Sequence, residues 1–236
     1  MNTQVQAILD LLRRVDEQRA QRTADPSLHD RVQAVKHYQH ERFQHTYADL
    51  LVQPRYAKAT RFFLEELYGP MDFTRRDTQF KRVVPGLVRL FPKEVVLTVQ
   101  TLGELHALSE ELDTAMGRHV PAGAVDLAGY VAAWQAVGRP ADREAQILLM
   151  RRVADALDVY TRNPFLRHSL RLMRTPARLA GLPELQAFLE AGFDTFGAMR
   201  GAQEFLDTVV RRERALAAWL FAARPAPAGS RFPPFG

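Results

Sequence analysis

Apolar residues recur every three or four positions through almost the whole chain, whereas the strict alternation typical of strands is nearly absent. Near the start, Val5, Ile8, Leu12 and Val15 share one helical face. Prolines and glycines divide the pattern into segments. We therefore predict an all-α multi-helix bundle of about nine helices, forming a single domain over residues 1–223. The predicted helices cover residues 3–22, 26–53, 54–68, 74–91, 92–118, 125–137, 141–162 and 183–222, with a further helix beginning at Asn163-Pro164.

Local signals add detail to this segmentation. Residues 74–77 resemble a capping box that would open a helix, and Asp77 would serve in it. Pro85 inside that helix predicts a kink or break near residues 81–84. Gly197 and Gly201 permit close approach of another helix to the final one, whose aromatic stripe suits a core or dimer seam. Residues 224–236, rich in proline and glycine, are predicted to form an irregular tail.

Composition excludes several classes of function. The chain of 236 residues is 47% hydrophobic and 25% charged, as in an ordinary globular protein. It contains no cysteine, which rules out disulfides, thiolate metal sites and cysteine nucleophiles. No apolar run approaches the roughly 18 residues that span a bilayer, and no secretory signal is visible. We expect a cytoplasmic protein with no membrane association.

The chain is arginine-rich and carries a net charge of +5. Four arginines follow one another at helical spacing in a stretch without acidic residues between Asp158 and Glu184. This basic stripe could track phosphates, bind an acidic partner helix, or pair with the acidic face of residues 92–118. No nucleic-acid-binding motif accompanies it, so nucleic acid is not the favoured partner. The stripe consists of Arg167, Arg171, Arg174 and Arg178, and the acidic face of Glu104, Glu110, Glu111 and Asp113.

One segment resembles a known family. Residues 62–92, FFLEELYGPMDFTRRDTQFKRVVPGLVRLFP, are similar to a segment of an uncharacterised family of bacterial all-helical proteins. The stretch LRLMRTPARLAGLPELQAFLEAGF from Leu170 and residues 199–213 resemble the same family. The resemblance implies a shared helical fold and brings no catalytic residue or cofactor.

A metal site on the second predicted helix is disfavoured by geometry. His37, Glu41 and His45 stand at i, i+4 and i+8, a spacing that could ligate a metal inside a bundle. These residues fall outside the apolar stripe of their helix, however, so we predict a solvated face and no metal.

Helical phase predicts that two titratable residues, His106 and Asp77, face the core or its edge. His106 lies at the edge of the apolar stripe of residues 92–118 and needs a partner from a neighbouring helix. The alternative is a haem ligand or an acid–base group in a cleft. Asp77 is in phase with Phe73 and Phe80. An inward carboxylate needs a cation, and the candidates nearest in sequence are Arg61, Arg76 and Arg82. If a ligand pocket exists, we predict that it includes Arg61, Tyr68, Asp72, Arg75, Asp77, Arg82 and His106.

Familiar catalytic motifs are missing, including phosphate-binding glycine loops, Gly-x-Ser-x-Gly and His-Glu-x-x-His. We therefore favour a non-enzymatic protein that acts through contacts with a protein partner or by self-association, without a cofactor. The first alternative is a small-molecule or haem-binding bundle, with or without enzymatic activity, that uses the Asp77 region and His106. The second alternative is binding of a nucleic-acid backbone by the basic stripe.

Overall fold

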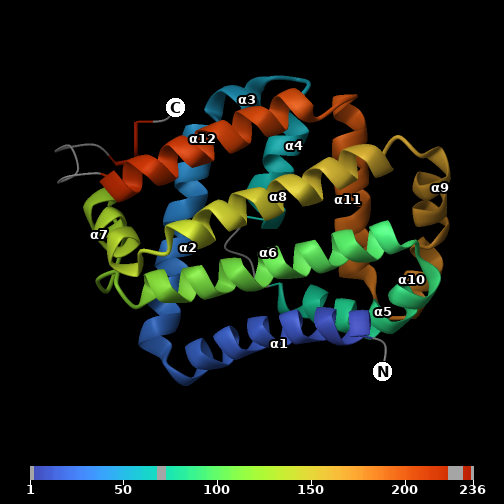
Figure 1. Ribbon diagram of the computed structural model, residues 1–236, viewed down its shortest axis with the longest axis horizontal. Helices are drawn as coiled ribbons and strands as arrows, with labels where there is room; N and C mark the ends of the chain where they lie inside the picture. The colour runs from blue at the N-terminus through green and yellow to red at the C-terminus, as the bar shows by residue number, and fades with distance from the viewer. Residues whose placement is uncertain (1–2, 68–72, 223–230, 235–236) are drawn as a thin grey trace.

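The computed structural model describes residues 3–67, 73–222 and 231–234, and the regular structure in these ranges is entirely helical. Four long helices, α1, α6, α8 and α12, run side by side along the molecule, and α2 and α11 cross behind them (Figure 1). The elements are α1 (Thr3–Ala24), α2 (Pro26–Thr46), α3 (Ala48–Val52), α4 (Ala57–Phe62), the π-helical turn η1 (Phe63–Leu67), α5 (Thr74–Leu90), α6 (Lys93–Gly117), α7 (Leu127–Val137), α8 (Pro140–Tyr160), α9 (Pro164–Leu172), α10 (Arg174–Leu179), α11 (Pro183–Met199) and α12 (Gln203–Ala222).

The all-α class is confirmed, but the described residues form twelve α-helices and not about nine. The predicted helix over 26–53 is divided at Tyr47, whose ring is fully buried and whose hydroxyl donates to Glu213 at 2.8 Å. The predicted final helix is divided at Arg200 and Gly201, with φ values of +54° and +117°. Because φ near +117° favours glycine, Gly201 turns the chain between α11 and α12, and the predicted role in close helix approach is wrong for it.

One prediction for α5 is wrong. Phe73 is the N-cap residue and makes no side-chain capping bond, so the capping box at residues 74–77 is not formed. Of the predicted kink or break near residues 81–84, the break does not occur, because the helix continues through Pro85 to Leu90, and the kink stays a prediction. Pro85 lies on the exposed side of the helix, where water can bind the backbone carbonyl that proline leaves without a donor. By contrast, Asn163 caps α9 as predicted and accepts bonds from the amides of Phe165 and Leu166.

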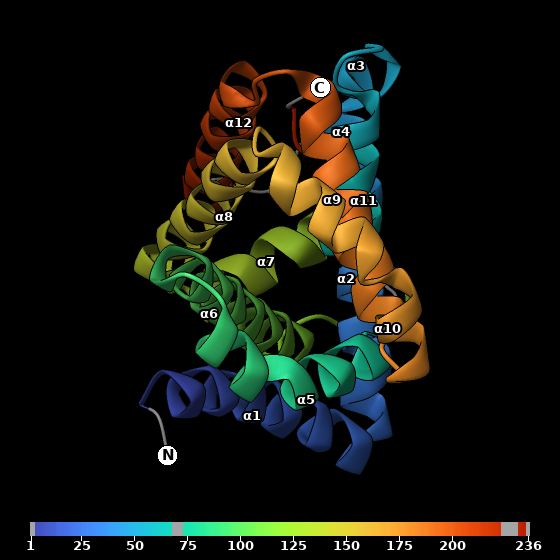
Figure 2. The same ribbon diagram turned by 90° about the vertical axis from the view of Figure 1, so that its right-hand side faces the viewer.

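The buried apolar side chains do not form one continuous core. They form several separate clusters, three of which are large. In Figure 2 the helices outline a triangle with α1 and α5 along its base. One cluster joins these two helices to α6 through Ile8, Leu12 and Val84. A second joins α2, α6, α7 and α12 around Tyr130 and Trp134. Members of all three large clusters, among them Leu12, Tyr130 and Met150, also line one internal cavity, which charged side chains reach as well.

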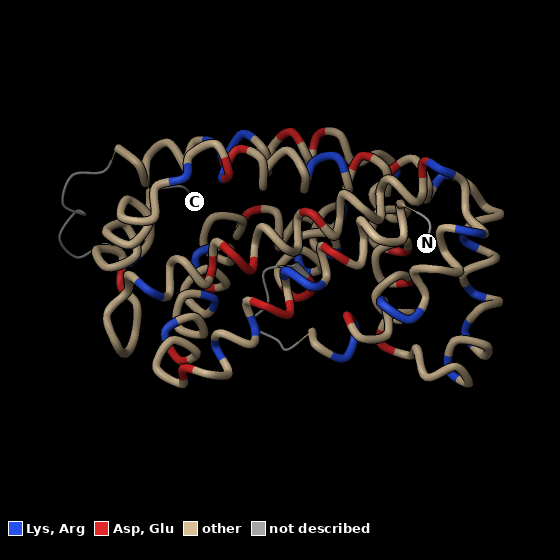
Figure 3. The backbone as a smooth tube through the Cα atoms, turned by 60° about the horizontal axis from the view of Figure 1, so that its bottom comes forward, with Lys and Arg blue, Asp and Glu red and all other residues tan. Residues whose placement is uncertain are grey.

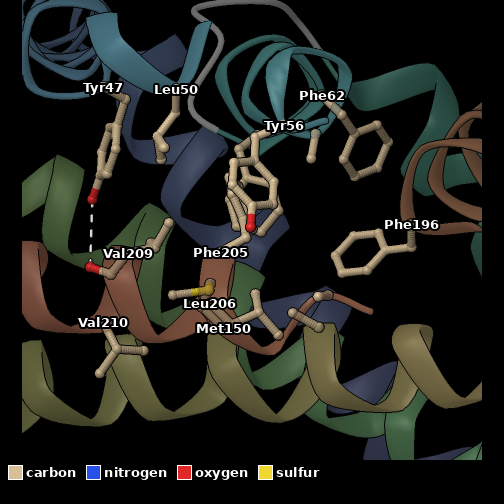
Figure 4. Close-up of a cluster of buried hydrophobic side chains, with 14 of the residues drawn as sticks. Tyr47, Leu50, Tyr56, Phe62, Met150, Phe196, Phe205, Leu206, Val209 and Val210 are labelled. Carbon is tan, nitrogen blue, oxygen red and sulfur yellow. Dashed lines mark hydrogen bonds between the residues drawn. The ribbon is translucent and has the colours of Figure 1, made fainter. Parts of the chain in front are cut away.

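The largest cluster fixes α3 and α4 against α8, α11 and α12. Figure 4 shows Phe62, Phe196 and Phe205 converging there, and the Tyr47 hydroxyl bonded to the Val209 carbonyl at 3.4 Å. Buried aromatic rings of this size contribute much of the burial that stabilises a core. The cluster therefore holds together one end of the bundle.

Part of the predicted irregular tail packs against α2. Arg231 pairs with Glu41 at 2.7 Å, and Phe232 stacks on His45 with ring centroids 5.2 Å apart. Tyr38 donates its hydroxyl to the Arg231 carbonyl at 3.2 Å. These residues have no helical or strand structure but are anchored. None of the described helices combines the length and hydropathy needed to cross a bilayer.

Candidate binding cavity

A cavity of about 240 Å³ lies between the apolar clusters. Its lining comes from η1 and from α1, α2, α5, α6, α7, α8, α11 and α12. A single water needs only about 10–15 Å³ on the same measure, so this space can hold several waters or an organic molecule. Charged side chains from five of these helices and from η1 reach it, which is unusual for a helical interior.

One group in the cavity wall joins Asp77 on α5 to His106 on α6. The Asp77 Oδ2 atom lies 2.8 Å from His106 Nε2 and 2.7 Å from the Arg19 guanidinium on α1. Burial alone would raise the pKa of Asp77, but the His106 hydrogen bond and the Arg19 charge outweigh it and lower the pKa below its usual value. Asp77 therefore stays ionised and holds the imidazole in place.

A second group is centred on Glu110 of α6. Its carboxylate accepts from Arg22 at 2.5 Å and from Lys36 at 3.0 Å, and Lys36 also lies 3.8 Å from Asp113. Burial acts to raise the pKa of Glu110, yet Lys36 and Arg22 lower it to about 2. Asp113 shares its cation with Glu110, and burial raises its pKa above the usual value. Glu110 therefore has two cationic partners, Arg22 and Lys36, whereas Asp113 lies near Lys36 and shares it with Glu110.

A third group lies where α2, α7, α8 and α12 meet. Arg42 donates to Glu213 at 2.6 Å, and the Arg143 guanidinium stacks 3.9 Å from the centroid of the Trp134 ring. Gln39 donates to the Tyr130 hydroxyl at 3.5 Å. The two arginines are 4% exposed, so their charge acts in a medium that screens little.

A smaller apolar cavity of about 140 Å³ adjoins the charged one. Six side chains line both cavities, which makes the two spaces neighbours along α6, α8 and α11. Several aromatic residues line this cavity alone, among them Phe62, Phe63 and Phe196. Together the cavities form a charged chamber and an apolar chamber. The shared side chains are Val99, Leu102, Leu105, Met150, Phe188 and Leu189.

The structure brings together two of the predicted pocket residues, Asp77 and His106, and both line the cavity. The arginines expected beside Asp77 bond elsewhere: Arg76 pairs with Glu66 at 3.1 Å and Arg82 donates to the Ala180 carbonyl at 3.0 Å. Arg75 lies on the surface, 3.7 Å from Glu184. Arg61 is exposed on α4, while Tyr68 and Asp72 lie outside the described residues. Binding of a ligand by any of these residues stays a prediction.

The basic stripe spans α9 and α10 and is largely paired within the chain. Arg167 contacts Asp194 at 2.5 Å and Arg174 forms a bidentate pair with Glu190, both on α11. Arg171 lies 3.8 Å from Asp194, and Arg178 is exposed. Figure 3 shows the blue segments of this region without red between them. The acids come from α11 and not from the acidic face expected on residues 92–118, so that pairing prediction is wrong for these arginines.

The histidines of α2 are arranged as the helical phase predicts. His37 and His45 are exposed, and His37 lies 3.5 Å from Glu41. Within the described residues, no group of three or more histidines and carboxylates has a metal-binding arrangement.

Sequence reasoning missed most of the charged lining. Lys36, Gln39 and Arg42 all point inward from α2, and the available signal was their phase with Val32, Val35 and Phe43 in the apolar stripe. No signal of this kind links Arg19 to Asp77, because the two residues meet only through tertiary packing.

Fold and cavity define an all-helical protein with a charged interior. The family model described as "Domain of unknown function (DUF8198)" matches residues 18–227, so the chain belongs to this family. This agrees with the predicted membership of an uncharacterised family. No curated protein and no solved structure gives a significant match.

Proposed function

We propose that the protein binds a small molecule in its central cavity. The supporting observation is that Asp77 and His106 meet beside a space of about 240 Å³ and not inside closed packing. A concave site with mostly apolar walls and a few convergent polar groups is the usual form of a ligand pocket. Maintaining so many buried charges costs stability, and a binding role accounts for that cost.

Haem is a poor candidate for the ligand. Histidine commonly ligates metals through Nε2, and in this protein His106 Nε2 is bonded to Asp77 at 2.8 Å. Iron at this atom would leave Asp77 and Arg19 to rearrange in a confined space. A small organic molecule beside the pair requires no such change.

Binding can be tested with cavity-filling variants. Ala217 of α12 lines the cavity, whereas its neighbour Ala218 is exposed. Native mass spectrometry of the purified full chain, followed by a thermal-shift screen of metabolites, should reveal a ligand. Ala217→Phe should weaken its binding at least tenfold, and Ala218→Phe should leave binding unchanged. A screen without any compound whose binding depends on Ala217 would contradict the proposal.

A second candidate function, contact with a protein partner or with another copy, is favoured by a different observation. α9 and α10 expose large apolar side chains, with Phe165 73% and Leu179 84% exposed, and Leu172 and Met173 lie between them. Clustered exposed apolar residues often mark interaction surfaces. Light scattering should then detect association that Phe165→Ser with Leu179→Ser abolishes; a monomer that retains no partner would contradict it. Both candidate functions suit a cytoplasmic protein.

A further inference from the structure

We infer that the apolar chamber is a second binding site, which takes an apolar molecule of about the size of one benzene ring. This site goes beyond the binding function proposed for the central cavity, and either site can exist without the other. Three features of the chamber support it: the hydroxyl groups in its wall are already bonded, aromatic rings hold it open, and its volume fits one ring.

Side chains with a polar atom are rare in the wall of the apolar chamber. Among the described residues that line it, only Thr98 of α6 and Tyr160 of α8 carry a side-chain nitrogen or oxygen. The Thr98 hydroxyl donates to the Glu94 carbonyl at 2.9 Å, and the Tyr160 hydroxyl lies 3.0 Å from Thr98 Oγ1. Because a hydroxyl has a single proton, Tyr160 is the donor in the second bond. These side chains therefore have no proton left to donate to a ligand, and an acceptor placed in the chamber would lose its bonds to water.

Aromatic rings hold the chamber open. Phe62 stacks on Phe188 with ring centroids 5.8 Å apart, and Phe63 lies 6.2 Å from Phe196. Phe63 also meets Phe205 edge-on within the largest apolar cluster, with centroids 5.5 Å apart. Collapse of these rings into the chamber would break contacts in that cluster, so the space persists when it is empty. A flat apolar ring in this space would gain the edge and face contacts that aromatic pairs prefer.

The volume of the chamber sets the size of its ligand. It measures about 140 Å³, close to the engineered apolar cavity of about 150 Å³ that stays dry and binds benzene. A buried water needs roughly two to four polar partners, which this wall does not supply. An apolar molecule therefore replaces a void with dispersion contacts and displaces little water.

Part of the wall lies close to solvent. Leu189 of α11 is 39% exposed, and Val99 and Leu102 of α6 are partly exposed, and all three line the chamber. Exposed side chains change rotamer within picoseconds to nanoseconds. We therefore expect a small ring to enter by displacing side chains between α6 and α11, without unfolding of either helix.

The test compares benzene with pyridine by titration calorimetry on the full chain, at a pH where pyridine is uncharged. The two rings have nearly the same shape, but the pyridine nitrogen is an acceptor that needs a donor. We expect benzene to bind, and pyridine to bind at least fivefold more weakly, because its nitrogen would stay without a hydrogen bond in the chamber.

Ala154→Leu locates the site. Ala154 of α8 is buried and lines the apolar chamber but not the charged one. The larger side chain would fill part of the chamber, so the affinity for benzene should fall at least tenfold. Ala156→Leu on the same helix is the matched control, because Ala156 is partly exposed and lines neither cavity. Ala217→Phe, which fills the charged chamber, should also leave benzene binding unchanged.

Val153→Ala provides a variant with the opposite effect. Val153 is buried and lines the apolar chamber alone. The substitution removes two methyl groups from the wall, and ethylbenzene carries two more carbon atoms than benzene. The affinity for ethylbenzene relative to benzene should therefore rise at least fivefold in this variant. This variant keeps the test decisive if Ala154→Leu fails to fold.

Three outcomes would overturn the inference and leave the function of the central cavity standing. The first is that benzene does not bind the native protein. The second is benzene binding that Ala217→Phe weakens and Ala154→Leu does not, which would place the ring in the charged chamber. The third is equal affinity for benzene and pyridine, which would show a hydrogen-bond donor at the site. Absence of any ligand sensitive to Ala217→Phe would overturn the function of the central cavity alone.

Discussion

At the scale of single residues, Asp77 is a buried carboxylate whose charge must be compensated by neighbouring helices. It is 6% exposed and receives one bond from a histidine on α6 and one from an arginine on α1. Removing one member of a buried ion pair leaves the other charge uncompensated, which costs more than the intact pair contributes. Asp77 therefore joins three helices through a single carboxylate.

Replacing this carboxylate by an amide should destabilise the protein. We expect Asp77→Asn to lower the free energy of unfolding by about 3 kcal/mol, because Arg19 loses its charge partner in a mostly buried position. Urea unfolding monitored by circular dichroism measures the change. Asp10→Asn is the control: Asp10 pairs with Arg13 on the surface, where such pairs contribute about 0–1 kcal/mol. Equal effects of the two substitutions would contradict the assigned role of Asp77.

The inward position of Asp77 was predictable from sequence, but its partners were not. Its phase with Phe73 and Phe80 is a local property of one helix. Arg19 stands 58 positions away; its phase with Leu12 and Val15 marks it as inward, but nothing in the pattern of α1 identifies Asp77 as its partner. The same limit applies to His106, whose need for a partner was evident while the identity of that partner was not.

At the scale of helices, α2 and α6 approach so closely that they require a glycine. A Cβ atom built on Gly117 would lie 2.4 Å from Val32 Cγ2 and 3.2 Å from the Val32 backbone nitrogen. Rotation of the valine side chain could relieve the first contact, but the second involves the backbone of α2. Gly117 thus sets the distance between two helices that both line the cavity.

The same substitution at two glycines should have opposite effects. Gly117→Ala should destabilise the protein by about 1–3 kcal/mol through overpacking. Gly86→Ala, in α5, meets nothing within 4 Å and should stabilise by about 0.5–1 kcal/mol, because alanine favours the helix more than glycine does. Midpoints of thermal or urea unfolding measure both changes. A stabilising Gly117→Ala would show that α2 and α6 are further apart than described.

Helix ends set by local chemistry were predicted well, and those set by tertiary contacts were not. Asn163 and Pro164 start α9 because a side-chain cap and a fixed φ act within a few residues. The division at Tyr47 depends on Glu213 and Val209 of α12, which lie more than 160 positions away. The spacing of Gly201 from Gly197 suggested a role in helix packing. Its φ of +117° shows instead that Gly201 belongs to the turn between α11 and α12.

At the scale of the whole molecule, buried charge adds to the apolar packing between helices. The Glu110 group joins α1, α2 and α6 through Arg22 and Lys36. An all-α class follows from helical periodicity, yet a charged cavity between apolar clusters does not. Periodicity reports which face of a helix is inward, and the space left between inward faces depends on crossing geometry that no single helix encodes.

The Glu110 group should make the stability of the protein depend on pH in the acid range. Because the pKa of Glu110 is about 2 in the folded protein and near 4.5 in the unfolded chain, ionisation contributes about 3 kcal/mol of stability above pH 4.5. This contribution falls by about 1.4 kcal/mol per pH unit as the pH drops from 4.5 toward 2, since the unfolded chain binds the proton first.

Comparison with Glu110→Gln isolates this effect. At pH 7 the variant should be less stable than the native protein by about 3 kcal/mol, and by pH 3 the difference should shrink by about 2 kcal/mol. Urea unfolding at pH 7, 5, 4 and 3 measures the difference directly. Glu111→Gln is the control: Glu111 is more exposed, pairs with Arg14 at 2.8 Å, and should cost about 1 kcal/mol or less at every pH. A difference for Glu110→Gln that stays constant from pH 7 to pH 3 would mean that Arg22 and Lys36 do not hold Glu110 ionised in the folded protein.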